Sequence, residues 1–339
     1  MQRKTMALIN HFCLIILATI ATTGALVYTK AVLVPFVFSI FFYAVLTPII
    51  SWMQYRLKLN RALAVSVTLL LFLAFSAGMI LILTSSIEEF LQGADLYRKK
   101  IFDLVGWISD KANDYGYELN RAIVKKYILG LPIFSYATNL TGLVFSFVGN
   151  ALLVIVFVLF LVVGENKNPD QSSAMMEKIL HQISSYVSTK TATSFATAIL
   201  VGAVLYGFGV DLALMFATLT FAFNFIPNIG SIVATLIPLP VIVLQFGMGW
   251  RFFLIMGLCS LIQSLIGNYI EPKIMGESLD LHPVTILVFL MFWGLIWGLS
   301  GLFLAVPITA IVKMVFAKIE TTQPLAELLA GRFPNTMQR

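Results

Sequence analysis

Long apolar runs alternate along this chain with short polar connections. A helix needs about 20 apolar residues to cross the hydrocarbon core of a bilayer, because each residue adds about 1.5 Å. Eight runs reach this length, and we expect each to be a transmembrane helix: 7–28, 32–53, 62–84, 141–163, 192–209, 250–270, 283–299 and 301–317. The predicted fold class is all-α, a polytopic membrane protein with about eight transmembrane helices.

The segment 212–246 interrupts this pattern. Its two apolar arms, of about 15 to 17 residues each, are short for a full crossing. Pro227 removes a backbone donor and Gly230 permits unusual dihedral angles, so we expect the helix to break between the arms. The sequence predicts a re-entrant or broken-helix hairpin here, with Pro238 and Pro240 kinking the returning arm.

Composition excludes an ordinary soluble globule. Of the 339 residues, 59% are hydrophobic and 11% are charged, which leaves too little polar surface to cover a soluble fold. The net charge of +6 would suggest nucleic acid in a soluble domain, but here the basic residues lie at the ends of apolar runs, so no nucleic-acid partner is expected. Cys13 and Cys259 both lie inside apolar runs, and we interpret them as packing residues.

Basic residues in short loops predict the orientation, because Lys and Arg near span ends stay cytoplasmic. The first run follows two basic residues and is long enough to span, so we interpret it as a membrane helix and not a cleaved leader. Parity then places both termini in the cytoplasm. The basic residues used are Arg3, Lys4, Arg56, Lys58, Arg61, Lys313 and Lys318.

Five regions are expected from this layout. Polar and helix-breaking clusters accumulate after about Tyr186, so we expect the C-terminal half to be the working part. The connection 85–140 carries seven basic and seven acidic residues, typical of a small helical subdomain at the membrane surface. The regions are 1–84, an N-terminal scaffold of three helices; 85–140, an extracytoplasmic helical loop; 141–191, the fourth span and a cytoplasmic amphipathic helix; 192–320, the transport core; and 321–339, a cytoplasmic tail.

The sequence lacks the motifs that would indicate hydrolytic or ATP-dependent chemistry. Gly-x-Ser-x-Gly, His-Glu-x-x-His and a phosphate-binding Gly-rich loop are all missing from the sequence. His11, His181 and His282 are not at ligand spacing, so no metal or other cofactor is expected and no residue is assigned a catalytic role. His282 precedes Pro283 at the start of a span, where it could cap the helix or titrate.

The stretch 192–270 carries only two charged side chains, Asp211 and Arg251, yet polar clusters interrupt it. A bilayer tolerates broken backbone at depth only where protein buries it or where it lines an aqueous path. We interpret Asp211 as a helix cap. The candidates for a substrate path are Asn224, Pro227, Asn228, Gly230, Gln263, Asn268, Glu271 and Lys190.

Glu271 is the main charged candidate, because a carboxylate inside a membrane is costly and points to function. It could equally be an interfacial anchor paired with Lys273 or with Lys190. Pro272 is expected to end the helix there. We expect the breaks at Pro227 and Pro272 to lie together beside a water-accessible cavity.

The last two spans contain glycines and tryptophans at helical spacing. Gly294, Gly298 and Gly301 permit close approach of two helices, which we favour over a ligand role. Trp293 and Trp297 lie one turn apart, and we expect them to pack or to form an interfacial belt.

Four segments match a known family in order and at compatible spacing. They are Tyr186 with Lys190 and Thr191, Phe223 to Gly230, Asn268 to Gly276, and Leu281 to Ile308. These segments resemble the autoinducer-2 exporter (AI-2E) family, and the N-terminal half agrees with it in layout only. The resemblance implies a homo-oligomeric permease of the bacterial inner membrane. It also implies a quorum-sensing substrate, autoinducer-2, a small furanone-type sugar derivative, although some relatives are associated with sodium or lithium extrusion against protons.

Three functions stay open at this point. The first is a secondary transporter that exports a small polar signal, most of all autoinducer-2, through neutral hydrogen-bonding groups. The second is a Na⁺(Li⁺)/H⁺ antiporter that uses Glu271. The third is a non-transporting membrane scaffold built around the loop 85–140.

Overall fold

The computed structural model describes residues 2–93, 151–164, 174–275 and 280–332, with isolated positions between 96 and 109. Within these residues the secondary structure is helical, and six helices are long and apolar enough to cross a membrane. In chain order the helices are α1 (Gln2–Tyr28), α2 (Lys30–Arg56), α3 (Arg61–Gln92), a helix Ala151–Val163, α7 (Ala174–Gly207), α8 (Ala213–Phe223), α9 (Ile229–Leu236), α10 (Leu239–Phe246), α11 (Trp250–Leu265), a π-helical turn (Ile266–Ile270), α12 (Glu271–Met275), α13 (Pro283–Trp297), α14 (Leu299–Phe316) and α15 (Gln323–Leu329). The predicted all-α class is confirmed, and each of the eight predicted spans contains a helix. The returning arm of the hairpin, Ile229–Phe246, is one of the six stretches long and apolar enough to cross a membrane, so the expectation that both arms are too short is wrong for this arm.

Two of these helices run past their predicted ends. α3 begins after Asn60, whose side chain accepts a hydrogen bond from the Leu63 amide at 2.8 Å, and continues to Gln92. The start of the predicted loop is therefore helical, while most of 94–150 lies outside the described residues. α7 is a single helix of 34 residues, Ala174–Gly207, since no Pro or Gly interrupts it before Gly202. The proposed boundary between the region 141–191 and the transport core 192–320 lies inside this continuous helix. The different functions assigned to these two regions stay a prediction.

The chain divides into two compact units. The first contains 1–48, 150–187 and 277–339, and the second contains 49–149 and 188–276. The boundaries fall inside α2 and α7, so each of these helices contributes to both units.

In the first unit, α13 and α14 form a closely packed hairpin. A Cβ at Gly301 would lie 1.8 Å from the carbonyl oxygen of Trp293, so only glycine fits there. The predicted close approach of two helices is confirmed at Gly301 and at Gly294, where a Cβ would lie 2.6 Å from the Leu302 side chain. It is wrong for Gly298, which links the two helices with φ +63° and has no atom within 4 Å of the place a Cβ would occupy. The rings of Trp293 and Trp297 lie 5.0 Å apart and both are buried, with the Trp297 indole donating to the Leu26 carbonyl at 3.1 Å. These tryptophans pack inside the protein.

Charged side chains join the segment before α13 to the end of the chain. Lys313 and Arg332 both donate to Oδ2 of Asp280, at 2.7 and 2.6 Å. Partial burial raises the pKa of Asp280, but Lys313 and then Arg332 outweigh it, so the pKa lies below its ordinary value. His282 caps α13 by accepting from the Val284 amide at 3.3 Å, as the capping interpretation predicts.

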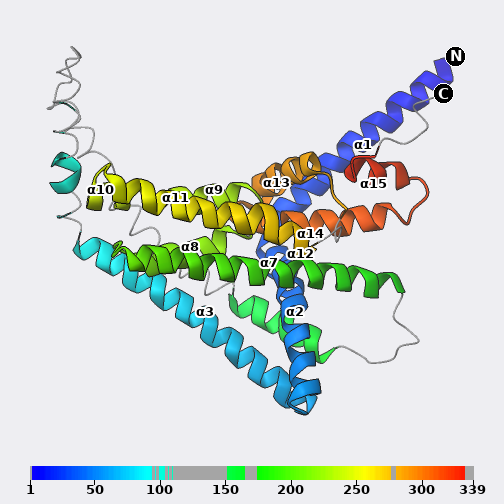
Figure 1. Ribbon diagram of the computed structural model, residues 1–339. Helices are drawn as coiled ribbons and strands as arrows, with labels where there is room; N and C mark the ends of the chain where they lie inside the picture. Colours follow the sequence, from blue (N-terminus) through cyan, green and yellow to red (C-terminus); the bar gives the residue numbers. More distant parts are fainter. Residues whose placement is uncertain are drawn as a thin grey trace. The chain divides into compact units, whose positions relative to one another are not determined.

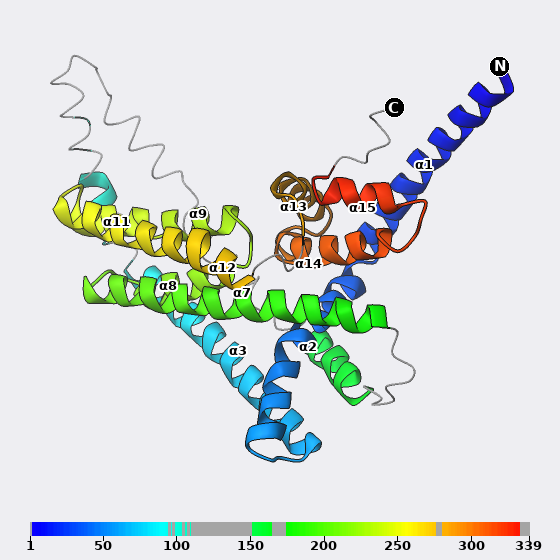
Figure 2. The ribbon, with the colours of Figure 1, turned by 45° about the vertical axis from the view of Figure 1, so that its right-hand side comes forward.

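In the second unit, a hydrophobic core joins α7, α8, α10 and α11. Leu205, Ile242 and Ile255 are fully buried at its centre. Figures 1 and 2 show α8 alongside α7 and α9 alongside α11. Gly202 of α7 faces Ala217 of α8 so closely that a Cβ on the glycine would lie 2.9 Å from the alanine Cβ. This close packing holds the broken segment after α8 in place.

Candidate functional site

The chain breaks after α8, as the sequence predicts. α8 has 11 residues, which makes it about 16 Å long at 1.5 Å per residue, short of the hydrocarbon thickness of a bilayer. Pro227 lies in the turn after this helix, and α9 begins at Ile229. A second break at Pro238 separates α9 from α10, which confirms the predicted kink in the returning arm.

The glycine of this turn serves close packing and not an unusual dihedral angle, so that part of the prediction is wrong. A Cβ at Gly230 would lie 1.8 Å from the carbonyl oxygen of Phe223. The positive φ is instead at Asn228, with φ +58° and ψ −56°. Asparagine tolerates positive φ better than most residues, because its short polar side chain makes local hydrogen bonds. The exposed Asn228 therefore shapes the turn.

A buried pair of amides ties the break to α11. Gln263 donates from Nε2 to Oδ1 of Asn224 at 3.0 Å and to the carbonyl of Ser231 at 3.3 Å. The two side chains are 8% and 5% exposed, so both amides are held away from solvent. Their pairing clamps both sides of the turn against one neighbouring helix.

A further set of polar side chains lies along α7 and α8. Ser194 and Thr220 are each 1% exposed, and their hydroxyl groups have no hydrogen-bond partner in the described part of the chain. The rings of Phe195 and Phe221 lie 6.3 Å apart, which places this stretch of α7 opposite the end of α8. Buried hydroxyls without partners are rare and often mark a bound water, ion or solute. Sequence reasoning missed these residues.

We name the buried and half-buried polar groups of this region the polar seam. Its members are Lys190, Thr193, Ser194, Thr197, Thr220, Asn224, Gln263 and Glu271. The four on α7 lie at positions i, i+3, i+4 and i+7, which is one face of a helix. That spacing of Lys, Thr and Ser in an apolar run was the signal available in the sequence.

Glu271 pairs with Lys190, one of the two partners left open. The ammonium lies 2.5 Å from the Glu271 carboxylate, and Thr193 donates to the other carboxylate oxygen at 3.4 Å. The side chains are 6% exposed for Lys190 and 18% for Glu271. Lys273 is exposed. The ion pair therefore compensates both charges of the seam.

Pro272 does not end its helix, so that prediction is wrong. The π-helical turn Ile266–Ile270 comes just before it, and α12 continues to Met275. A proline ring ordinarily collides with the carbonyl four residues earlier. The wider turn, with the Glu271 amide donating to the Ile266 carbonyl, changes the hydrogen-bond register and relieves that collision. It also carries Asn268, which is exposed.

The sequence predicts that the breaks at Pro227 and Pro272 lie together, but the Pro227 turn is hydrogen-bonded to an earlier part of α11. The structure joins the Pro227 turn to α11 at Gln263, before the π-helical turn that precedes Pro272. The water-accessible cavity between the breaks stays a prediction.

Asp211 is not a helix cap, which corrects that interpretation. Leu212, in a left-handed conformation, is the N-cap residue of α8, and its side chain makes no capping hydrogen bond. The amide of Asp211 donates to Gln245 Oε1 at 2.9 Å, and Gln245 Nε2 donates to the carbonyl of Gly209 at 2.6 Å. Gln245 therefore closes this turn from α10.

Comparison with known proteins gives the family. The model of the AI-2E family transporter matches residues 14–321. The chain is 28% identical over 313 residues to the AI-2 transport protein TqsA of Escherichia coli K12, covering 89% of this chain and 90% of that protein. It is 28% identical over 336 residues, 93% of this chain and 94% of the relative, to a Haemophilus influenzae protein named "Putative transport protein". A Borreliella burgdorferi protein of the same name is 39% identical over 157 residues, 46% of this chain and 43% of the relative. The chain therefore belongs to the AI-2E family of transporters and is a multi-pass membrane protein.

Proposed function

We propose that this protein is a secondary transporter that exports a small polar signal molecule, autoinducer-2 first of all, across the bacterial inner membrane. The observation that carries the proposal is the buried amide pair of Asn224 and Gln263 at a helix break. In transporters, broken helices place backbone and side-chain polar groups at the substrate site. The name of the Escherichia coli relative supports the choice of substrate.

The chemistry of the polar seam suits an uncharged, hydroxyl-rich solute. Its amides and hydroxyls supply donors and acceptors, and the unpartnered Ser194 and Thr220 hydroxyls are free to bind such a solute. Its two charges compensate each other in the Lys190–Glu271 pair. Neutral hydrogen-bonding groups fix the orientation of a polar ligand without selecting for charge.

Cation/proton antiport would need a carboxylate that exchanges protons in the path. Glu271 is already held by an ammonium and a hydroxyl, so a cation would have to displace Lys190. This arrangement favours the exporter over the antiporter within the same family.

The test is flux in proteoliposomes that hold the purified full-length protein. Labelled autoinducer-2 and sodium are measured separately, with and without a proton gradient. We expect autoinducer-2 flux in the wild type. Gln263→Met should lower it about tenfold or more, since it strands the buried Asn224 amide. Ser264→Ala, at an exposed neighbour on α11, is the matched control and should leave flux unchanged.

Two outcomes would overturn the proposal. Sodium flux that depends on the proton gradient, without autoinducer-2 flux, would assign the antiporter. No flux of either solute from a correctly folded preparation would favour the scaffold, and deletion of the loop 85–140 would then be the informative variant.

A further inference from the structure

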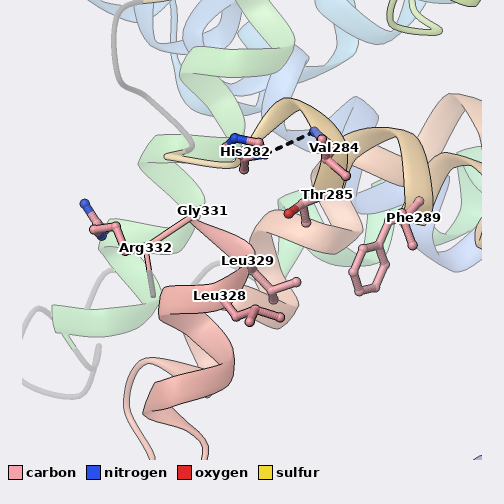
Figure 3. A pocket seen from close by; sticks show the side chains of 9 residues that line it. His282, Val284, Thr285, Phe289, Leu328, Leu329, Gly331 and Arg332 are labelled. Atoms are coloured by element: carbon pink, nitrogen blue, oxygen red, sulfur yellow. Dashed lines mark hydrogen bonds between the residues drawn. The ribbon is translucent and has the colours of Figure 1, made fainter. Parts of the chain in front are cut away.

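A groove of about 400 Å³ lies between the start of α13 and the end of α15 (Figure 3). All of its lining residues belong to the first unit, and none is part of the polar seam. The groove therefore needs an explanation separate from the proposed transport path.

The end of α15 is fixed against the cap of α13. The His282 amide donates to the Leu329 carbonyl at 3.0 Å. Gly331 then takes a left-handed conformation, with φ +78°, and a Cβ there would lie 2.4 Å from the His282 ring. The positive φ and the lack of space for a Cβ both require glycine at position 331. The turn at Gly331 places Arg332 among the residues that line the groove.

The lining changes from polar to apolar along the groove. Figure 3 shows Arg332 at one end and Phe289 at the other, with Thr285 between them. Val284 and Val288 are 58% and 57% exposed. Their exposure continues along α13 at helical spacing, through Leu287, Met291 and Leu295. An apolar stripe of this kind, on a helix of a membrane protein, faces acyl chains.

Charged side chains gather at the polar end. Lys313 and Arg332 both donate to the carboxylate of Asp280. The Arg332 side chain is 61% exposed, and its guanidinium uses one of five N–H donors on Asp280. The remaining donors match the geometry of a phosphate group.

We propose that this groove binds one anionic phospholipid of the surrounding bilayer. The guanidinium of Arg332 holds the phosphate at the polar end, and an acyl chain covers Val288 and Phe289. Basic pockets at the ends of transmembrane helices recognise anionic headgroups in this way. A free phosphate ion would leave the apolar half of the groove uncovered, which is why the lipid is the occupant that fits.

The experiment is native mass spectrometry of the delipidated full-length protein in detergent. It is titrated with phosphatidylglycerol or with phosphatidylcholine of identical acyl chains. We expect preferential binding of phosphatidylglycerol to the wild type. Arg332→Gln should weaken that binding about fivefold, the value of one basic contact near a lipid headgroup. Val288→Trp, which keeps the charge and fills the apolar half, should weaken both lipids.

Lys318→Gln removes an exposed basic residue that does not line the groove, and it is the matched control for charge. Equal binding of the two lipids would overturn the proposal, as would phosphatidylglycerol affinity that Arg332→Gln and Val288→Trp leave at the wild-type value. Inorganic phosphate that competes with the lipid at equal concentration would show an anion site without a lipid chain. Should Arg332→Gln fail to fold, Val288→Trp alone decides the matter.

Discussion

Lys190 and Glu271 depend on each other because each charge lies in a largely apolar region. An unpaired charge inside a membrane protein costs several kcal/mol, whereas a paired one is tolerated. The 2.5 Å contact and the hydroxyl of Thr193 satisfy the carboxylate from two sides. The pair therefore adds little net stability, and its importance shows when one partner is lost.

Removal of one partner should be more harmful than removal of both. We expect Lys190→Met or Glu271→Met alone to lower the free energy of unfolding by about 3 kcal/mol, because each strands a buried charge. The double variant should lose less than either single variant, because it leaves no buried charge unpaired. Thermal unfolding in detergent measures all three, with the exposed Lys273→Met as control. Strictly additive losses would mean that the two charges do not interact.

The α13–α14 hairpin shows how tightly two helices of this protein can approach. At Gly301 the hairpin has no room for a methyl group, whereas Gly257 of α11 has no atom within 4 Å of the place a Cβ would occupy. Both glycines lie inside helices, so their backbone propensities are alike and only the packing differs.

These two glycines make a matched comparison. Gly301→Ala should destabilise the protein by about 1 to 3 kcal/mol, the usual cost of overpacking, since the Trp293 carbonyl must move. Gly257→Ala should be neutral or stabilise by up to about 1 kcal/mol, from helix propensity alone. Unfolding midpoints in one detergent report both changes. A similar midpoint for the two variants would show that the hairpin opens easily at this contact.

The sequence predicts where the helices lie more accurately than it predicts where they break. The breaks at Pro227 and Pro238 arise at residues that cannot continue a helix. At Pro272 the same rule fails, because a π-helical turn accommodates the ring. The apolar pattern of Ile266–Ile270 carries no sign of that turn, since the register of backbone hydrogen bonds depends on tertiary packing.

Some residues of the candidate site could likewise be predicted from the sequence, whereas others could not. Asn224 and Gln263 stand out in the sequence as amides in apolar runs. Their hydrogen bond joins residues 39 positions apart, so it depends on the tertiary fold and not on the local sequence. The partner of Glu271 could be narrowed to two lysines by charge alone. Ser194 and Thr220 are not predicted as site residues, because hydroxyl residues are common in membrane helices. Their burial without a hydrogen-bond partner, which only the structure shows, distinguishes them from other hydroxyl residues.

The distribution of charge over the whole chain bears on its orientation. Basic residues come after the second and the last spans, at Arg56, Lys58 and Lys318, while Glu88 and Glu89 lie near the end of α3. By the rule that short basic loops stay inside, both termini should face the cytoplasm.

Reporter fusions test this orientation. Green fluorescent protein fused after Arg339 should fluoresce and alkaline phosphatase there should be inactive, because the former needs the cytoplasm and the latter the periplasm. Fusions after residue 114, in the connection 85–140, should give the opposite pattern and serve as the control. Active phosphatase at the C-terminus would reverse the assigned topology.

The Lys190–Glu271 contact also constrains how the protein is made. The two residues are 81 positions apart, so at about 5 to 20 residues per second Lys190 is synthesised roughly 4 to 16 seconds before its partner exists. During that interval the ammonium has no carboxylate to neutralise it. We expect the nascent α7 to wait in the insertion machinery or at the lipid headgroups until Glu271 emerges, which makes the biogenesis of this core a late, concerted event.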